Sequence, residues 1–197
     1  MTAHVILLRH AALPDAWAGR WAGGGSDPPA DPTALRALSG PVARAASAHP
    51  PARVLSSPLA RARATAALLG LPLAIDARLA ERDFGRWEGR PVADCLGGVD
   101  PADLASAERY LAIAIPGAEP ADAVVRRAEA LWRELSQTAG TTWCVGHGGS
   151  LRALLAAACR LSLADAFRIS IAPGAMLALT APRVSGGRRW RWGWLSG

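Results

Sequence analysis

Two histidines in this chain each follow a short apolar run, in surroundings that suit phosphoryl chemistry. His10 comes directly after Arg9 at the end of residues 4–9, and His147 stands in a glycine-rich turn after residues 141–145. A neutral imidazole can act as a nucleophile, and a neighbouring arginine disfavours the imidazolium, which keeps the nitrogen lone pair available. A guanidinium also supplies fixed donors for phosphoryl oxygens. His10 is therefore the candidate nucleophile.

Three further positions could hold an anion near these histidines. Ser57 directly follows another apolar run. Arg61 lies about one turn inside the helix expected to follow, and its planar guanidinium group could bind two phosphate oxygens from there. Gly148 opens a helix, where backbone N–H groups favour an anion. From spacing alone each role competes with a structural one: a solvated helix face for Arg61, and a capping residue for His147.

The elements that must position these residues alternate along the chain. Apolar runs predict strands at 4–9, 53–56, 73–75 and 141–145, with candidate strands at 168–171, 175–180 and 189–195. Helical patterns predict helices at 33–48, 58–69 with Ser57 as the N-cap, 101–111, 120–137 and 150–159. This order indicates an α/β fold, a three-layer sandwich with a mainly parallel central sheet, as a single domain over residues 1–197. In such folds the active site lies at the carboxyl ends of the strands.

The composition narrows the class of protein. All 22 basic residues are arginine, the formal charge is +6, and 51% of the residues are apolar. A basic charge suits anionic small molecules as well as nucleic acid, but the arginines are spread along the chain, so we expect no nucleic-acid partner. Since no apolar run approaches the roughly 18 residues of a membrane span or resembles a secretory signal, we expect a cytoplasmic protein without a membrane partner. Cys95, Cys144 and Cys159 give no disulfide framework and no Cys-x-x-Cys metal clip.

Four motifs, in order, resemble those of the histidine phosphatase superfamily, which has the phosphoglycerate-mutase-like fold. Residues 5–11 (VILLRHA) are similar to its Arg-His-Gly signature, and residues 56–66 (SSPLARARATA) to its Ser-Pro-Leu-x-Arg-Ala-x-x-Thr-Ala motif. Residues 79–89 (LAERDFGRWEG) look like its Leu-x-Glu-x-x-Phe-Gly-x-Trp-Glu-Gly stretch, and residues 145–152 (VGHGGSLR) like its second-histidine motif. By size and loop pattern the chain most resembles the short, α-ribazole-phosphatase-like members.

The resemblance implies a role for each matched residue. His10 would attack phosphorus and form a phosphohistidine, while Arg9, Arg61 and His147 would hold the phosphoryl oxygens. Gly148 and Ser57 are further substrate-binding positions. No metal and no other cofactor is required, because arginines take the role of a cation.

A carboxyl group completes the expected site. The resemblance implies that Glu81 protonates the leaving oxygen and then activates water, a two-way use that one carboxyl can perform. Asp83 and Glu88 are its rivals: Asp83 is the second choice for the acid, and Glu88 is expected to tie down the loop at Trp87.

The loops after His10 depart from the family, so the motifs predict the reaction better than the substrate. Ala11, Leu13 and Ala16 stand where many members have Gly, Thr and Asn, and Gly25 where related phosphatases often have arginine. The first hypothesis is a phosphatase for a small phosphomonoester. The alternatives are a phosphoglycerate-type mutase, which must cage its intermediate away from water, and a non-catalytic module that binds an anion or nucleic acid. Residues 188–195 alternate Trp and Arg in part, which favours an edge strand that could serve a homodimer.

Overall fold

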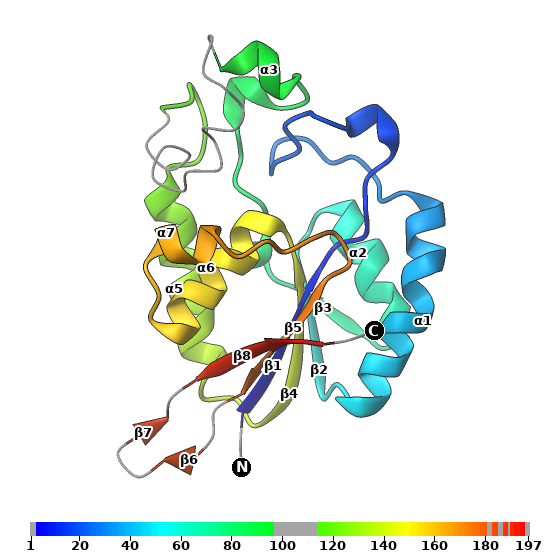
Figure 1. Cartoon of the computed structure of the whole chain (residues 1–197), viewed down its shortest axis with the longest axis vertical. Coiled ribbons are helices and arrows are strands. Elements are labelled where there is room, and N and C mark those ends of the chain that lie inside the picture. Colours follow the sequence, from blue (N-terminus) through cyan, green and yellow to red (C-terminus); the bar gives the residue numbers. More distant parts are fainter. Residues whose placement is uncertain (1–2, 97–113, 181–182, 185–186, 189, 196–197) are drawn as a thin grey trace.

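A computed structural model of the protein describes residues 3–96, 114–180, 183–184, 187–188 and 190–195 of the chain. The helices and strands are shown in Figure 1. In chain order they are β1 (Ala3–Arg9), α1 (Pro32–Ala48), β2 (Arg53–Ser56), α2 (Ala60–Ala66), β3 (Leu73–Ile75), α3 (Val92–Cys95), α5 (Ala121–Leu135), β4 (Gly140–Gly146), α6 (Gly148–Cys159), α7 (Leu163–Phe167), β5 (Met176–Thr180), β6 (Arg183–Val184), β7 (Gly187–Arg188) and β8 (Arg191–Trp194).

A six-stranded sheet with the strand order β3-β2-β4-β1-β5-β8 runs through the molecule. β3, β2, β4 and β1 pair in parallel, whereas β5 and β8 are antiparallel additions at one side. The expected α/β fold with a mainly parallel sheet is confirmed. Because β1 and β4 lie side by side with Arg9 opposite Gly146, the chain segments that follow them, with His10 and His147, leave the sheet at the same edge.

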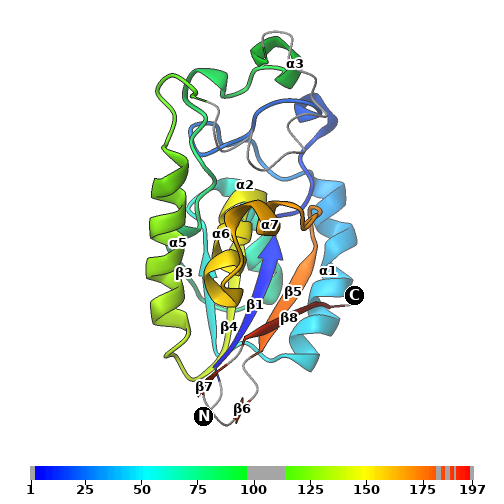
Figure 2. The same cartoon turned by 60° about the vertical axis from the view of Figure 1, so that its left-hand side comes forward.

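Helices cover both faces of the sheet, as Figure 2 shows, which gives the three layers. On one face Val5 and Leu7 pack with α5 and α6, and on the other face Ile6 and Leu8 pack with α1 and α2. Strands that are buried on both faces need apolar side chains at every position, which accounts for the unbroken apolar run of β1. Cys144, on the central strand β4, is fully buried, and this burial raises the pKa of its thiol to about 12.

The expected strand at residues 168–171 is wrong. Helix α7 ends at Phe167, and the chain then runs irregularly to β5. Two carbonyl groups of this segment accept from guanidinium groups rather than from a neighbouring strand: Ile169 O accepts from Arg152 Nε (2.8 Å) and Ile171 O accepts from Arg9 Nη1 (2.6 Å). Side-chain donors therefore satisfy backbone acceptors that a sheet would otherwise pair.

The helix expected at residues 58–69 begins later, and Ser57 is not its N-cap. The α-helix spans Ala60–Ala66 and continues as a 3₁₀ turn, Ala67–Leu69. Its first N–H, from Ala60, is capped from a distant loop by the carboxylate of Asp27 (2.8 and 3.0 Å). The Ser57 hydroxyl accepts from the N–H of Leu59 (3.2 Å), before the helix begins, and it also lies against His147, as described below.

Three other expectations concern the second half of the chain. The expected strand at 189–195 is found as β8, at the edge of the sheet with Trp192 and Trp194 exposed; residue 189 itself is outside the described residues, and a homodimer stays a prediction. The expected helix at 101–111 also lies outside the described residues. In the part of the chain that the structure describes, no helix is long and apolar enough to cross a membrane.

Candidate active site

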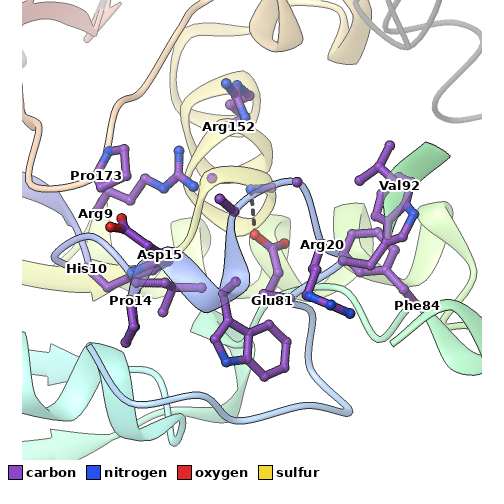
Figure 3. A pocket seen from close by; sticks show the side chains of 18 of the residues that line it. Arg9, His10, Pro14, Asp15, Arg20, Glu81, Phe84, Val92, Arg152 and Pro173 are labelled. Carbon is purple, nitrogen blue, oxygen red and sulfur yellow. Dashed lines mark hydrogen bonds between the residues drawn. The ribbon is translucent and has the colours of Figure 1, made fainter. Parts of the chain in front are cut away.

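His10 lines a cavity of about 720 Å³ at the carboxyl end of β1. Figure 3 shows this cavity with Arg9 and Glu81 beside His10. The His10 side chain is only 5% exposed. Its position is fixed from both directions, because its own N–H donates to Gly146 O (3.0 Å) and the following N–H, of Ala11, donates to the buried hydroxyl of Thr65 (3.0 Å).

The hydrogen bond of the His10 ring decides which nitrogen carries the lone pair. Nδ1 lies 2.6 Å from the carbonyl oxygen of Ala11. Because a carbonyl can only accept, Nδ1 must carry the proton, and Nε2 of the neutral ring then carries the lone pair. Burial, reinforced by the charges of Arg9 and Arg61 and opposed by the bond to Ala11, lowers the pKa of His10 to about 3. The ring is therefore neutral near pH 7.

Next to His10, on the side away from the cavity, lie three fully buried side chains that are hydrogen-bonded to one another: His147, Arg61 and Ser57. The ring centroids of His10 and His147 are 5.0 Å apart. Arg61 Nε donates to Nδ1 of His147 (3.2 Å), so Nε2 of His147 carries the proton and donates to the Ser57 hydroxyl (2.8 Å). Burial, with the charge of Arg61 next, lowers the pKa of His147 well below its ordinary value. None of the three side chains lines the cavity.

The guanidinium of Arg61 is held by the loop after β1. Its Nη atoms donate to the carbonyl oxygens of Gly23 (2.8 Å), Ser26 (3.2 Å) and Ala22 (3.3 Å), and Asp27 lies 3.7 Å away. Arg61 is therefore not on a solvated helix face, which was the competing interpretation of the sequence. It is buried, and its hydrogen bonds fix the loop and the tautomer of His147.

Glu81 enters the cavity from the segment after β3. One carboxylate oxygen accepts from the N–H of Gly149 (2.9 Å), and the other accepts from the N–H of Arg82 (2.9 Å). Gly149 must lack a side chain for this contact, because a Cβ there would lie 2.3 Å from Glu81 Oε1. Glu81 is thus the carboxyl of its motif that shares the cavity with His10.

The rival carboxyls lie elsewhere. Asp83 does not line the cavity, and its carboxylate accepts from the N–H of Gly85 (2.7 Å). Glu88 ties the loop after β1 to the loop at Trp87. Its two oxygens accept from the N–H groups of Gly23, Gly25 and Ser26 and from the Ser26 hydroxyl in the first loop, and from the N–H of Phe84 in the second.

Sequence reasoning missed two arginines in the cavity wall, Arg152 and Arg20. Arg152, half-buried on α6, lines the cavity with Arg9 and Gly148. It stands four residues after Gly148, and residues four apart lie on one face of a helix. That spacing is the signal that could have identified it. Asp15 and Arg20 also line the cavity, from a loop whose sequence carries no such pattern.

The described residues contain no group of three or more His, Cys, Asp and Glu side chains placed to hold a metal ion. The cations of the cavity wall are instead the arginines at positions 9, 20 and 152, with Arg61 behind. Burial is the main influence on Arg9 and lowers its pKa, while the charge of Glu81 acts in the opposite direction. The arrangement can thus bind an anion beside a neutral imidazole and a carboxyl group.

Several solved structures share the fold over nearly the full chain. A mycobacterial glucosyl-3-phosphoglycerate phosphatase is 25% identical, with a TM-score of 0.80 over 98% of this chain and 97% of that chain. An Escherichia coli K-12 protein assigned as an α-ribazole-5′-P phosphatase is 21% identical, with a TM-score of 0.83 over 100% and 97% of the two chains. Phosphoserine phosphatase of Entamoeba histolytica is 19% identical, with a TM-score of 0.73 over 89% of each chain.

The sequence comparisons agree with the motifs. No protein of curated function matches the chain in sequence. The model of the histidine phosphatase superfamily (branch 1), in contrast, matches residues 5–191, which include all four motifs. The chain belongs to the histidine phosphatase superfamily.

Proposed function

We propose that the protein hydrolyses a small phosphomonoester through a phosphohistidine intermediate on His10. The observation that carries the proposal is the hydrogen bond from His10 Nδ1 to the carbonyl of Ala11, because it makes Nε2 the nucleophilic nitrogen of a neutral ring. The mycobacterial neighbour, a phosphatase of a small phosphate ester by its name, supports the choice of substrate class.

The two chemical steps use His10 and Glu81. Nε2 of His10 bonds to phosphorus as the ester P–O bond breaks, and Glu81 gives its proton to the leaving oxygen. Glu81, now a carboxylate, then takes a proton from water, and that water attacks the phosphohistidine. Inorganic phosphate leaves, and His10 and protonated Glu81 are restored.

The remaining residues bind and position. Arg9 and the N–H of Gly148, both in the cavity wall, hold phosphoryl oxygens. Arg61, His147 and Ser57 lie outside the cavity wall, next to His10. There the buried charge of Arg61 stabilises the negative charge that develops on the transferring group, and the hydrogen bonds from Arg61 to His147 and from His147 to Ser57 fix the ring of His147.

An assay with p-nitrophenyl phosphate in the presence of EDTA tests the proposal. We expect chelator-resistant turnover in the wild type and none in His10→Ala. Since p-nitrophenolate leaves without needing an acid, Glu81→Gln should still form the phosphoenzyme but hydrolyse it slowly, which gives a burst of nitrophenolate. Turnover by His10→Ala would refute the assignment of the nucleophile. A requirement for a bisphosphate primer would indicate a mutase instead.

A further inference from the structure

Arg152 and Arg9 place two guanidinium groups against the same residue of the cavity wall. A Cβ added to Gly148 would lie 3.1 Å from Arg152 Nη1 and 3.4 Å from Arg9 Cζ. Long side chains on a helix lean toward its N-terminus, so Arg152 covers the turn that begins with Gly148. Because Gly148 has no side chain, both guanidinium groups lie close to its backbone.

Both guanidinium groups are also anchored on one segment. Arg9 Nη1 donates to Ile171 O, and Arg152 Nε donates to Ile169 O. Arg152 in addition lies over the ring of Phe167, 5.5 Å from its centroid. Since these contacts hold the two arginines in place, the cavity presents two adjacent, fixed cations. One guanidinium group can then bind the phosphoryl group while the other binds an anionic group next to it.

The two arginines stand at different places relative to the nucleophile. Arg9 directly precedes His10, and its charge, with that of Arg61, lowers the pKa of His10. The charge of Arg152 acts on Arg9. Figure 3 shows the side chain of Arg152 on α6, beyond the guanidinium of Arg9 as seen from His10. Arg9 is thus placed for the reacting phosphoryl group, and Arg152 for a group next to it.

We propose that Arg152 is a specificity residue that binds a second anionic group of the substrate, a carboxylate or a phosphate, a few bonds from the phosphoryl group that is transferred. The proposal rests on the phosphohydrolase function above for the identity of the reacting group. The substrate class is then a phosphomonoester that carries a further negative charge, rather than a neutral alcohol or sugar ester.

Binding of three matched, non-hydrolysable phosphonates tests this without any turnover. Propylphosphonate carries one anionic end, and 3-phosphonopropionate and 1,3-propanebisphosphonate carry a carboxylate or a second phosphonate at the other end. We expect the wild type, in calorimetric titrations, to bind at least one of the doubly anionic ligands about 10- to 100-fold more tightly than propylphosphonate. The doubly anionic ligand that binds more tightly, the carboxylate or the bisphosphonate, identifies the chemical nature of the second anionic group.

Variants separate recognition from structure. Arg152→Gln should abolish this preference while its affinity for propylphosphonate stays within about threefold, and Arg152→Lys, which keeps the charge, should restore part of the preference. Arg126→Gln, an exposed arginine on α5, is the matched control and should behave as the wild type. Equal weakening of all three ligands in Arg152→Gln would show a general structural role, and no preference in the wild type would overturn the proposal. If the preference is present but no phosphomonoester is turned over, only the proposed function fails.

Discussion

Glu88 offers a direct test of how the loop after β1 is held. Its Oε1 accepts from the N–H groups of Gly25 (3.1 Å) and Phe84 (2.8 Å), and its Oε2 accepts from the N–H groups of Gly23 (3.0 Å) and Ser26 (3.1 Å) and from the Ser26 hydroxyl. In Glu88→Gln the amide nitrogen replaces one of these oxygens, so at least two donors lose their acceptor. Two lost bonds to a half-buried charged group reduce the free energy of unfolding by about 2–4 kcal/mol.

For a chain of this size a loss of this magnitude lowers Tm by about 5–15 °C, which differential scanning calorimetry can measure. Glu129→Gln, at an exposed position of α5, is the matched control and should leave Tm unchanged. The loop also supplies the carbonyl groups that hold Arg61, so kcat of Glu88→Gln should fall as well. A Tm within about 2 °C of the wild type would refute the reasoning, because it would show that the five donors find water instead.

Three further outcomes follow from the geometry. Thr65→Val removes the buried hydroxyl that links the turn after β1 to α2, and we expect urea unfolding to show a loss of about 1–3 kcal/mol; an unchanged midpoint would contradict this. Gly149→Ala places a methyl group 2.3 Å from Glu81 Oε1, so kcat should fall about tenfold or more while Tm changes little. An unchanged kcat would mean that the position of Glu81 beside Gly149 is not the one needed for proton transfer. The pKa of His10 is about 3 in the folded protein against 6.5 for an ordinary histidine, so the unfolded chain binds more protons between these values and stability falls as the pH drops through this range. His10→Asn should therefore lose less stability than the wild type between about pH 6.5 and pH 4.5, and equal losses in urea titrations would contradict the buried neutral ring.

Local sequence patterns predict the core of the site well. The apolar run of β1 predicts a buried strand, and the position of His10 directly after it predicts the edge of the sheet where it lies. The run of β4 places His147 by the same reasoning. These predictions succeed because a parallel sheet brings the ends of its strands together whatever the loops do.

The parts that local patterns did not predict are those decided by long-range donors and acceptors. Residues 168–171 have the alternation of a strand, but Arg9 and Arg152 take their carbonyl groups. Ser57 has the composition of an N-cap, but the helix begins later, at Ala60, whose N–H donates to Asp27. The Ser57 hydroxyl accepts from the N–H of Leu59 and from His147. No local sequence pattern predicts the course of the loop that brings Asp27 to the first turn of this helix.

The burial of Cys144 makes this thiol a reporter on the whole fold. A thiolate must form and meet its reagent before a cysteine is alkylated, and Cys144 lies at the centre of the sheet with its pKa raised to about 12. Its alkylation therefore requires opening of β4 itself, the strand between β1 and β2. Cys95 and Cys159 are partly exposed and can react through local fluctuations. The labelling rate at Cys144 thus measures global opening under native conditions, without denaturant and without any substrate.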